Sequence, residues 1–161
     1  MKTSKVKPIP EGYHTITPAL IVKDAGRAIE FYKQAFGAKE IMRMNSPDGK
    51  NVMHCELEIG NSRLFVGCEC PEGMSRSAES LGGTAVSLYL YVEDVDSAFD
   101  RAVKAGAQVR VPLTDMFWGD RYGKVTDPFG HEWDLATHKE DLTPEQIHER
   151  AEEFFAQTAK K

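Results

Sequence analysis

The 161-residue chain has little of what nucleic-acid-binding proteins and secreted proteins need. Its 20 Lys and Arg are outnumbered by 25 Asp and Glu, so the sequence offers no excess of positive charge to a phosphate backbone. It has three cysteines, Cys55, Cys68 and Cys70, an odd number that matches neither a disulfide framework nor a four-cysteine zinc site. We therefore expect reduced thiols, no nucleic-acid partner, and a small molecule as the ligand.

Long apolar runs are also lacking. Residues 1–12 contain lysines without the apolar stretch of a secretion signal, and no run elsewhere approaches the roughly 20 residues of a membrane span. These absences predict a cytoplasmic protein with no membrane partner. A chain of 161 residues is long enough to bury a core without disulfides or metal ions.

What the sequence does have is an internal repeat, which decides the architecture. The stretch TPALIVKDAGRAIEFYKQAFGAKEI from Thr17 matches SLYLYVEDVDSAFDRAVKAGAQVRV from Ser87, a shift of 70 residues. Two copies of one supersecondary unit are therefore predicted. The shift also aligns a helix start and a later turn in the two copies: Asp24 with Asp94, and Gly60-Asn61 with Gly130-His131.

Each copy has the pattern of a strand, a helix and about three further strands. Apolar residues alternate at 19–22 and at 88–92, which indicates the first strand of each copy. Asp24 and Asp94 follow where a helix N-cap is expected. The other expected helix features are the C-terminal glycines Gly37 and Gly106 and the apolar positions Ile29, Tyr32, Phe36, Phe99, Ala102 and Val103.

The predicted fold class is α+β, with two βαβββ modules forming a curled mixed sheet around a cleft, followed by a C-terminal helix. Gly, Ser and Glu between the two copies indicate an exposed linker. Thr143, Pro144 and Gln146 have the spacing of a capping box at the start of the C-terminal helix. The expected parts are an N-terminal extension at 1–14, modules at 15–70 and 85–138, a linker at 71–84, and the helical tail at 139–161.

Alternation along the strands sorts their side chains into two faces. The face covered by helices is expected to be apolar, and the opposite face mixes aromatic and polar residues, as expected of a sheet that curves around a ligand. The expected covered face consists of Leu20, Val22, Cys55, Leu57, Ile59, Leu88, Leu90, Trp133 and Leu135. The expected open face includes His54, Glu56, Leu64, Val66, Tyr89, Tyr91, Lys124, Glu132 and Asp134.

Particular motifs resemble a known family. The pattern V-x-D-x-x-R-A-I-x-F-Y in the first copy, and YVEDVDSAF and DPFGHEW in the second, resemble the vicinal oxygen chelate superfamily over about residues 15–138. That superfamily includes glyoxalase I, extradiol dioxygenases, fosfomycin-resistance enzymes and bleomycin-binding proteins. FWGDRYG followed by DPFGHEWDLATH resembles its PhnB-like group. The resemblance implies two βαβββ modules and a cleft but no particular reaction.

The resemblance also implies where a metal ion would bind. Metal-binding members take ligands from the first and last strands of each module, and these positions fall on Thr17, approximately Leu64, Ser87 and Asp134. One carboxylate in four is too few for a divalent ion that needs about three His or carboxylate ligands. We therefore expect no metal or other cofactor. If a divalent metal is bound, its expected ligands are Asp134, His54 and Glu56.

Three features of the sequence each allow two interpretations. His54 and Glu56 are either a general base with its orienting carboxylate or two residues of a solvated strand face. Trp118 either stacks on a planar ligand or is a structural residue that closes one end of the barrel. Asp120-Arg121 either clamps an anionic substrate or forms a surface pair that fixes a loop.

Two main functional hypotheses follow, and a third is a structural or interaction module that uses the tail helix. The first is a metal-independent homodimer that binds a small aromatic or hydrophobic molecule. The second is a metal-dependent lyase, isomerase or dioxygenase of the glyoxalase type. The candidate catalytic residues are His54 and Glu56, and the candidate ligand-binding residues are Tyr89, Tyr91, Trp118 and Arg121, with His54 beside them.

Overall fold

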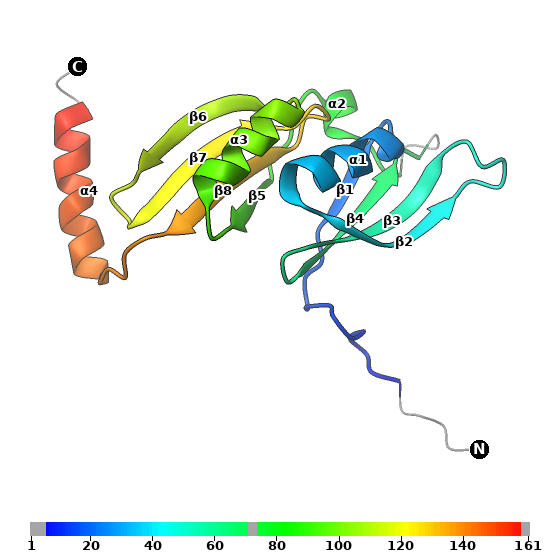
Figure 1. The fold of residues 1–161 in the computed structure, drawn as a ribbon, viewed down its shortest axis with the longest axis horizontal. Coiled ribbons are helices and arrows are strands. Elements are labelled where there is room, and N and C mark those ends of the chain that lie inside the picture. The colour runs from blue at the N-terminus through cyan, green and yellow to red at the C-terminus, as the bar shows by residue number, and fades with distance from the viewer. Residues whose placement is uncertain (1–5, 71–73, 159–161) are drawn as a thin grey trace. The chain divides into compact units, whose positions relative to one another are not determined.

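A computed structural model describes residues 6–70 and 74–158, and the chain divides into two compact units, Met1–Gly83 and Thr84–Lys161 (Figure 1). Each unit is a four-stranded mixed sheet with a helix across one face. The predicted repeat and fold class are confirmed, because both units have the order strand, helix and three strands, and a C-terminal helix follows.

The first sheet has the strand order β1-β4-β3-β2, in which β1 and β4 are parallel and the other neighbours are antiparallel. Helix α1 lies against β3 and β4. The elements are β1 Ala19–Val22, α1 Ala25–Phe36, β2 Lys39–Asn45, β3 Val52–Ile59, β4 Ser62–Cys68 and the short α2 Ala78–Leu81.

The second sheet repeats this plan with the order β5-β8-β7-β6, and β5 and β8 form its parallel pair. Helix α3 lies against β7 and β8, and α4 follows the sheet at the C-terminal end of the unit (Figure 1). The elements are β5 Ser87–Tyr91, α3 Val95–Ala105, β6 Gln108–Asp115, β7 Asp120–Thr126, β8 Glu132–His138 and α4 Pro144–Thr158.

The helix ends are built as the sequence predicts. The side chain of Asp24 accepts a hydrogen bond from the Arg27 N–H at the start of α1, and Asp94 caps α3 in the same way. Gly37 ends α1 with φ 67°, the left-handed conformation that favours glycine. At α4, the Thr143 hydroxyl and the Gln146 side chain form the expected reciprocal capping box.

The side chains on the helix-covered faces confirm most of the predicted core and correct part of it. Leu64 and Val66 are buried, so their assignment to the open face was wrong. They lie opposite Leu57 and Cys55 in the β3–β4 ladder, and directly paired residues share a face. The predicted core positions Leu88 and Leu90 are only partly buried, and Val103 is exposed.

The segment predicted as a linker, 71–84, contains local structure, although residues 71–73 lie outside the described part of the chain. Ser77 is fully buried, and both its N–H and its hydroxyl donate to the Glu69 carboxylate. These bonds hold the pKa of Glu69 at about 2 and fix the start of α2.

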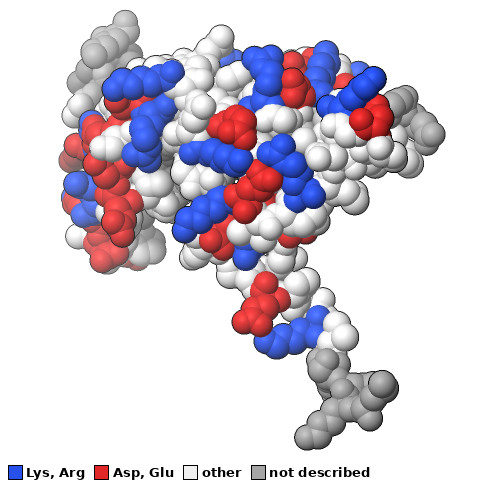
Figure 2. Space-filling model, turned by 45° about the vertical axis from the view of Figure 1, so that its right-hand side comes forward, with Lys and Arg blue, Asp and Glu red and all other residues white. Residues whose placement is uncertain are grey.

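The structure shows the state of the cysteines and the distribution of charge on one face. Cys55, Cys68 and Cys70 are free thiols, and burial raises the pKa of Cys55 to about 11. On the face shown in Figure 2, Lys and Arg are interspersed with Asp and Glu. Within the described ranges, no helix is both long and apolar enough to cross a membrane.

Candidate functional site

The open face of the second sheet carries a row of tyrosines and charged groups. Tyr89 on β5 and Lys124 on β7 both lie opposite Asp134 on β8, so the three side chains share this face. Tyr91 and Tyr122 both pair with Ala136 one step further along. The predicted sorting of the second sheet's open face is therefore confirmed.

A buried carboxylate, Asp120, is the hub of this face. It is only 3% exposed. Its Oδ2 accepts hydrogen bonds from the Tyr89 hydroxyl at 3.3 Å, the Tyr91 hydroxyl at 3.0 Å and the Trp118 indole N–H at 3.2 Å. Its Oδ1 lies 2.7 Å from His138 Nδ1. With four partners, the carboxylate fixes three aromatic side chains from two segments of the chain.

The four aromatic residues Tyr89, Tyr91, Trp118 and Tyr122 form what we call the aromatic wall. The rings of Tyr89 and Tyr91 lie 4.9 Å apart, and Tyr122 lies 5.9 Å from Tyr89 and 5.6 Å from Trp118. Tyr89 and Tyr91 remain 46% and 60% exposed. Burial, then Tyr91 and Asp120, raises the pKa of Tyr89. Burial, then the hydrogen bond to Asp134, raises the pKa of Tyr122, so both phenols stay neutral donors.

A second carboxylate on the same face, Asp134, is also fully engaged. It accepts hydrogen bonds from the hydroxyls of Ser87 and Tyr122. The Lys124 ammonium lies 3.5 Å from it and 3.1 Å from Glu132. Asp134 therefore already has a cationic neighbour and two donors, which is an unfavourable setting for a metal ligand.

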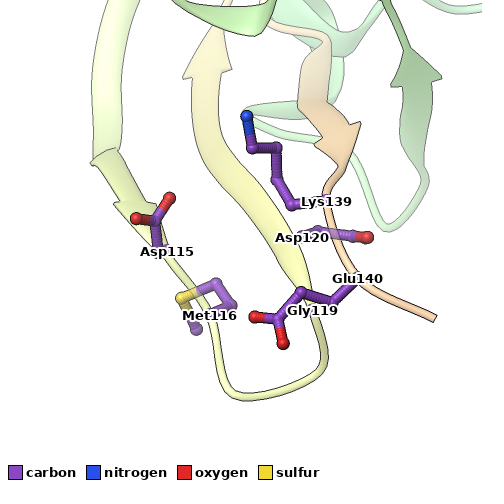
Figure 3. A pocket seen from close by; sticks show the side chains of 6 residues that line it. All are labelled: Asp115, Met116, Gly119, Asp120, Lys139 and Glu140. Atoms are coloured by element: carbon purple, nitrogen blue, oxygen red, sulfur yellow. The ribbon is translucent and has the colours of Figure 1, made fainter. Parts of the chain in front are cut away.

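A pocket of about 240 Å³ lies beside Asp120, at the loop that joins β6 to β7 (Figure 3). Lys139 and Glu140 reach it from the chain that follows β8. The loop is held close to that chain: a Cβ on Gly119, whose φ is 95°, would lie 2.6 Å from the Glu140 carbonyl oxygen. The lining residues are Asp115, Met116, Gly119, Asp120, Lys139 and Glu140.

The C-terminal helix contacts the same loop through aromatic rings. Phe117 packs on Phe154 at 5.5 Å and on Phe155 at 5.8 Å, and its other neighbour is Trp118 at 4.9 Å. Arg150 of α4 forms two hydrogen bonds with Glu140. Helix α4 thus supports the loop that carries one member of the aromatic wall.

Arg121 and Asp120 do not pair with each other, although they are adjacent. Arg121 points to the opposite side of β7, where its guanidinium forms a bidentate pair with Asp96 of α3 and a 3.3 Å contact with Asp115. These carboxylates raise the pKa of Arg121 and use the donors that a substrate anion would need.

The open face of the first sheet brings together the predicted pair His54 and Glu56. His54 Nε2 lies 3.5 Å from Glu56 Oε1, and the other oxygen of Glu56 accepts the hydroxyl of Tyr13 from the N-terminal segment. The His54 ring lies 4.9 Å from Phe65. A pocket of about 450 Å³ beside them is lined by Pro8, Ile9, Pro10, Tyr13, His14, Thr15, Thr17, Glu56 and Phe65.

The positions that would hold a metal ion in this fold can now be assigned from strand pairing. Ala19 of β1 lies opposite Phe65, and its repeat equivalent Tyr89 lies opposite Asp134. The counterpart of Asp134 is therefore Phe65, not Leu64, which faces the core because a one-residue slip changes the face. The four positions hold Thr17, Phe65, Ser87 and Asp134.

These side chains do not fit a metal centre. One carboxylate, two hydroxyls and a phenyl ring lack the donors that a divalent ion requires. In the part of the chain that the structure describes, no three His, Cys, Asp or Glu side chains form a group that could hold a metal ion.

Sequence reasoning missed four residues that organise these faces: Asp120 as a hub, Tyr122, His138 and Tyr13. Alternation along β7 placed Lys124 on the open face, and the same parity includes Tyr122 and Asp120. His138 and Tyr13 gave no comparable signal, because Asp120 and Glu56, which they contact on these faces, lie 18 and 43 residues away in the sequence.

Comparison with known proteins places the fold in a family. Residues 13–135 match the model of the glyoxalase/bleomycin resistance protein/dioxygenase superfamily. The chain belongs to this superfamily. It is 44% identical over 135 residues to the Mycobacterium tuberculosis protein Rv0887c, covering 82% of this chain and 79% of that one.

Two solved structures share the architecture. The Arabidopsis thaliana protein At5g48480 is 34% identical, with a TM-score of 0.62 over 77% of this chain and 98% of that one. The PhnB protein of Bacillus cereus is 19% identical, with a TM-score of 0.60 over 77% and 99% of the two chains, and it shows the fold alone. The superfamily inferred from the motifs is therefore confirmed, and a PhnB protein is among the structures that share its fold.

Proposed function

We propose that this protein binds a small aromatic or hydrophobic molecule on the aromatic wall, without a metal ion, in the cytoplasm. The observation that carries the proposal is that Tyr89 and Tyr91 are largely exposed and are nevertheless held by the buried carboxylate of Asp120. Tyrosines with their hydroxyls fixed present their ring faces in one arrangement, which lowers the entropy lost when a ligand stacks on them.

The other candidate residues have different parts in this proposal. Trp118 extends the aromatic wall through its ring contact with Tyr122. Arg121 acts from the far side of β7, where it ties the strand to α3 through Asp96. Glu56 lines the first unit's pocket and contacts His54, and the contribution of these two residues to the same ligand stays a prediction.

The competing proposal is a glyoxalase-type lyase, isomerase or dioxygenase in which His54 acts as a general base and Glu56 orients it, with or without a divalent metal. It is favoured by one observation, the contact of Glu56 with both His54 and Tyr13 beside a pocket of about 450 Å³. The donor set described above disfavours the metal-dependent form.

Equilibrium binding of naphthylmethanol, a neutral aromatic probe, tests the main proposal. We expect Tyr91→Ala to weaken binding about three- to tenfold, because one stacking partner is lost. The matched control is Ile21→Ala at the equivalent position of β1, which should leave the affinity unchanged. The absence of binding, or equal affinity in Tyr91→Ala, would contradict the proposal.

The metal-dependent form of the enzyme alternative predicts a different result for the same protein. Mn²⁺ or Ni²⁺ would then raise the melting temperature of the protein, and His54→Ala or Glu56→Gln would abolish that rise, because only the folded state holds the ion.

We also propose that the protein is a homodimer. Strand β2 is an edge of the first sheet, and its Ile41, Met42 and Met44 are 46%, 41% and 49% exposed. Met53, at the start of the adjacent β3, is 52% exposed. An exposed edge with apolar side chains is a favourable surface for contact with a second copy.

A further inference from the structure

His138, the last residue of β8, lies between two carboxylates. Its Nδ1 is 2.7 Å from Asp120 Oδ1, and its Nε2 is 3.0 Å from Asp141 Oδ1. An ionised carboxylate can only accept hydrogen bonds, and a neutral imidazole donates from one nitrogen only. Both bonds form together only when the ring is an imidazolium that donates from each nitrogen.

The stronger of the two contacts is the one to Asp120. Asp120 is buried, whereas Asp141 is fully exposed and its ion pair is screened by solvent. The β7–β8 ladder places Asp120 directly opposite His138, so backbone pairing fixes their proximity. His138 is therefore the cationic partner of the carboxylate that holds three members of the aromatic wall.

We propose that Asp120 and His138 are positioning residues for the aromatic wall, and that protonation of His138 makes ligand affinity depend on pH. This inference rests on the proposed function for its ligand and on the described contacts for its mechanism. When His138 is charged, one oxygen of Asp120 is neutralised and the other accepts from Tyr89, Tyr91 and Trp118. Loss of that charge leaves the buried carboxylate with neutral donors alone.

The direction of the pH effect follows from the groups around His138. Hydrogen bonding to Asp120, then to Asp141, raises the pKa of His138 above its usual range. A raised pKa means that the stabilising contact is present below the ordinary histidine pKa and is lost as the pH rises through the raised value. The other titratable groups of this cluster are Tyr89 and Tyr91, which share Asp120 with His138, and Asp115, Lys139 and Glu140 around the adjoining pocket. Arg150 on α4 pairs with Glu140, and the Arg121–Asp96 pair lies on the opposite side of β7.

The two tryptophans give a readout that needs no ligand. Trp118 donates its indole N–H to Asp120, whereas the indole of Trp133 donates to Asp127. In ¹⁵N-labelled protein titrated from about pH 5 to about pH 9, we expect the Trp118 indole signal to follow the same midpoint as the His138 ring. Trp118→Phe assigns the signal, and the Trp133 signal is the internal reference.

Three variants separate positioning from a merely structural role. Asp141→Asn should lower the midpoint of both signals, because it removes one carboxylate, and should keep the two titrations coupled. His138→Gln should abolish the titration of Trp118. His148→Gln, on α4 where His148 pairs with Glu152, is the matched control and should change nothing. A Trp118 signal that stays constant while His138 titrates would overturn the inference, even if His138→Gln fails to fold.

The affinity for naphthylmethanol, measured as a function of pH, tests whether the arrangement of the aromatic wall affects ligand binding. We expect the dissociation constant of the wild-type protein to rise about three- to tenfold from below to above the His138 midpoint, and that of His138→Gln to be independent of pH. Wild-type affinity that does not change with pH would refute the inference and leave the proposed function standing. Coupled titrations of His138 and Trp118 without any binding would refute the proposed function and the pH-dependent affinity, and would support only the positioning of the aromatic wall by Asp120 and His138.

Discussion

The two units share one backbone plan, and the same positions on their open faces hold different chemistry. Where the second unit has Tyr89 and Asp134, the first has Ala19 and Phe65. The second face therefore has tyrosines that donate hydrogen bonds to carboxylates. The first has the pair His54 and Glu56, and Glu56 accepts a hydrogen bond from Tyr13. The difference shows that the repeat determines the backbone of each unit, and that residue differences at a few equivalent positions decide which open face presents aromatic rings.

In the cores of the two units, one pair of equivalent positions on the helix and the sheet holds side chains of different sizes. In the second unit, a Cβ on Gly123 would meet Phe99 of α3 at 2.6 Å. The equivalent positions in the first unit hold Cys55 and Ile29, both fully buried. A large side chain on the helix thus accompanies glycine in the second sheet, and a smaller one accompanies cysteine in the first.

The turns between the last two strands differ most, and we expect the largest effect there. In the second unit, Asp127 is buried and accepts hydrogen bonds from the N–H groups of Phe129 and His131 and from the indole of Trp133. Asp127→Ala leaves these donors without that carboxylate, so we expect a loss of about 3 kcal/mol of unfolding free energy, measured by urea denaturation.

The control for that change is Asn61→Ala in the two-residue turn of the first unit, which should cost less than about 0.5 kcal/mol. Similar losses in the two variants would show that the two turns contribute equally to stability, contrary to this comparison.

A change in the packing between Gly123 on β7 and Phe99 on α3 should have an intermediate effect on stability. Gly123→Cys introduces a side chain into the space of Phe99, and we expect it to reduce the unfolding free energy by about 2 kcal/mol. Adding Phe99→Ile reproduces the pair found in the first unit, so the double variant should recover part of that loss. If the two changes are additive in a double-mutant cycle, the packing of the two positions is not coupled.

The sheet edges should give the smallest change in stability. Strand β6 carries Pro112 and Arg110, which protect an edge from pairing, whereas β2 exposes Ile41 and Met44. We expect Ile41→Lys with Met44→Glu to change the unfolding free energy of the isolated chain by less than about 0.5 kcal/mol, because these positions are exposed.

Sedimentation equilibrium tests the assembly in the same variant. Its mass should fall from that of a dimer to that of a monomer, while the control variant Val109→Lys on β6 should remain dimeric. A wild-type protein that sediments as a monomer, or a double variant that remains dimeric, would contradict the proposed interface.

The sequence was a good guide to the elements of each unit and a weaker guide to the open faces. Asp24, Gly37 and Thr143 were recognised because capping is local, within one turn of a helix. The misassignment of Leu64 came from counting a constant shift across turns of unequal length. Phe65 lies opposite Ala19 and Asp134 lies opposite Tyr89, so the shift at this point of the chain is 69 residues rather than 70.

The sequence by itself determined the repeat, the order of strands and helices, the helix ends and the superfamily. It also showed that the superfamily's metal-binding positions have too few His and carboxylate side chains. These features depend on local periodicity and on residue type. Only the tertiary structure identified Asp120 as the hub joining Tyr89, Tyr91, Trp118 and His138. A hydrogen bond depends on distance and direction between side chains up to 31 residues apart, and pairing of β5, β7 and β8 is what brings them together.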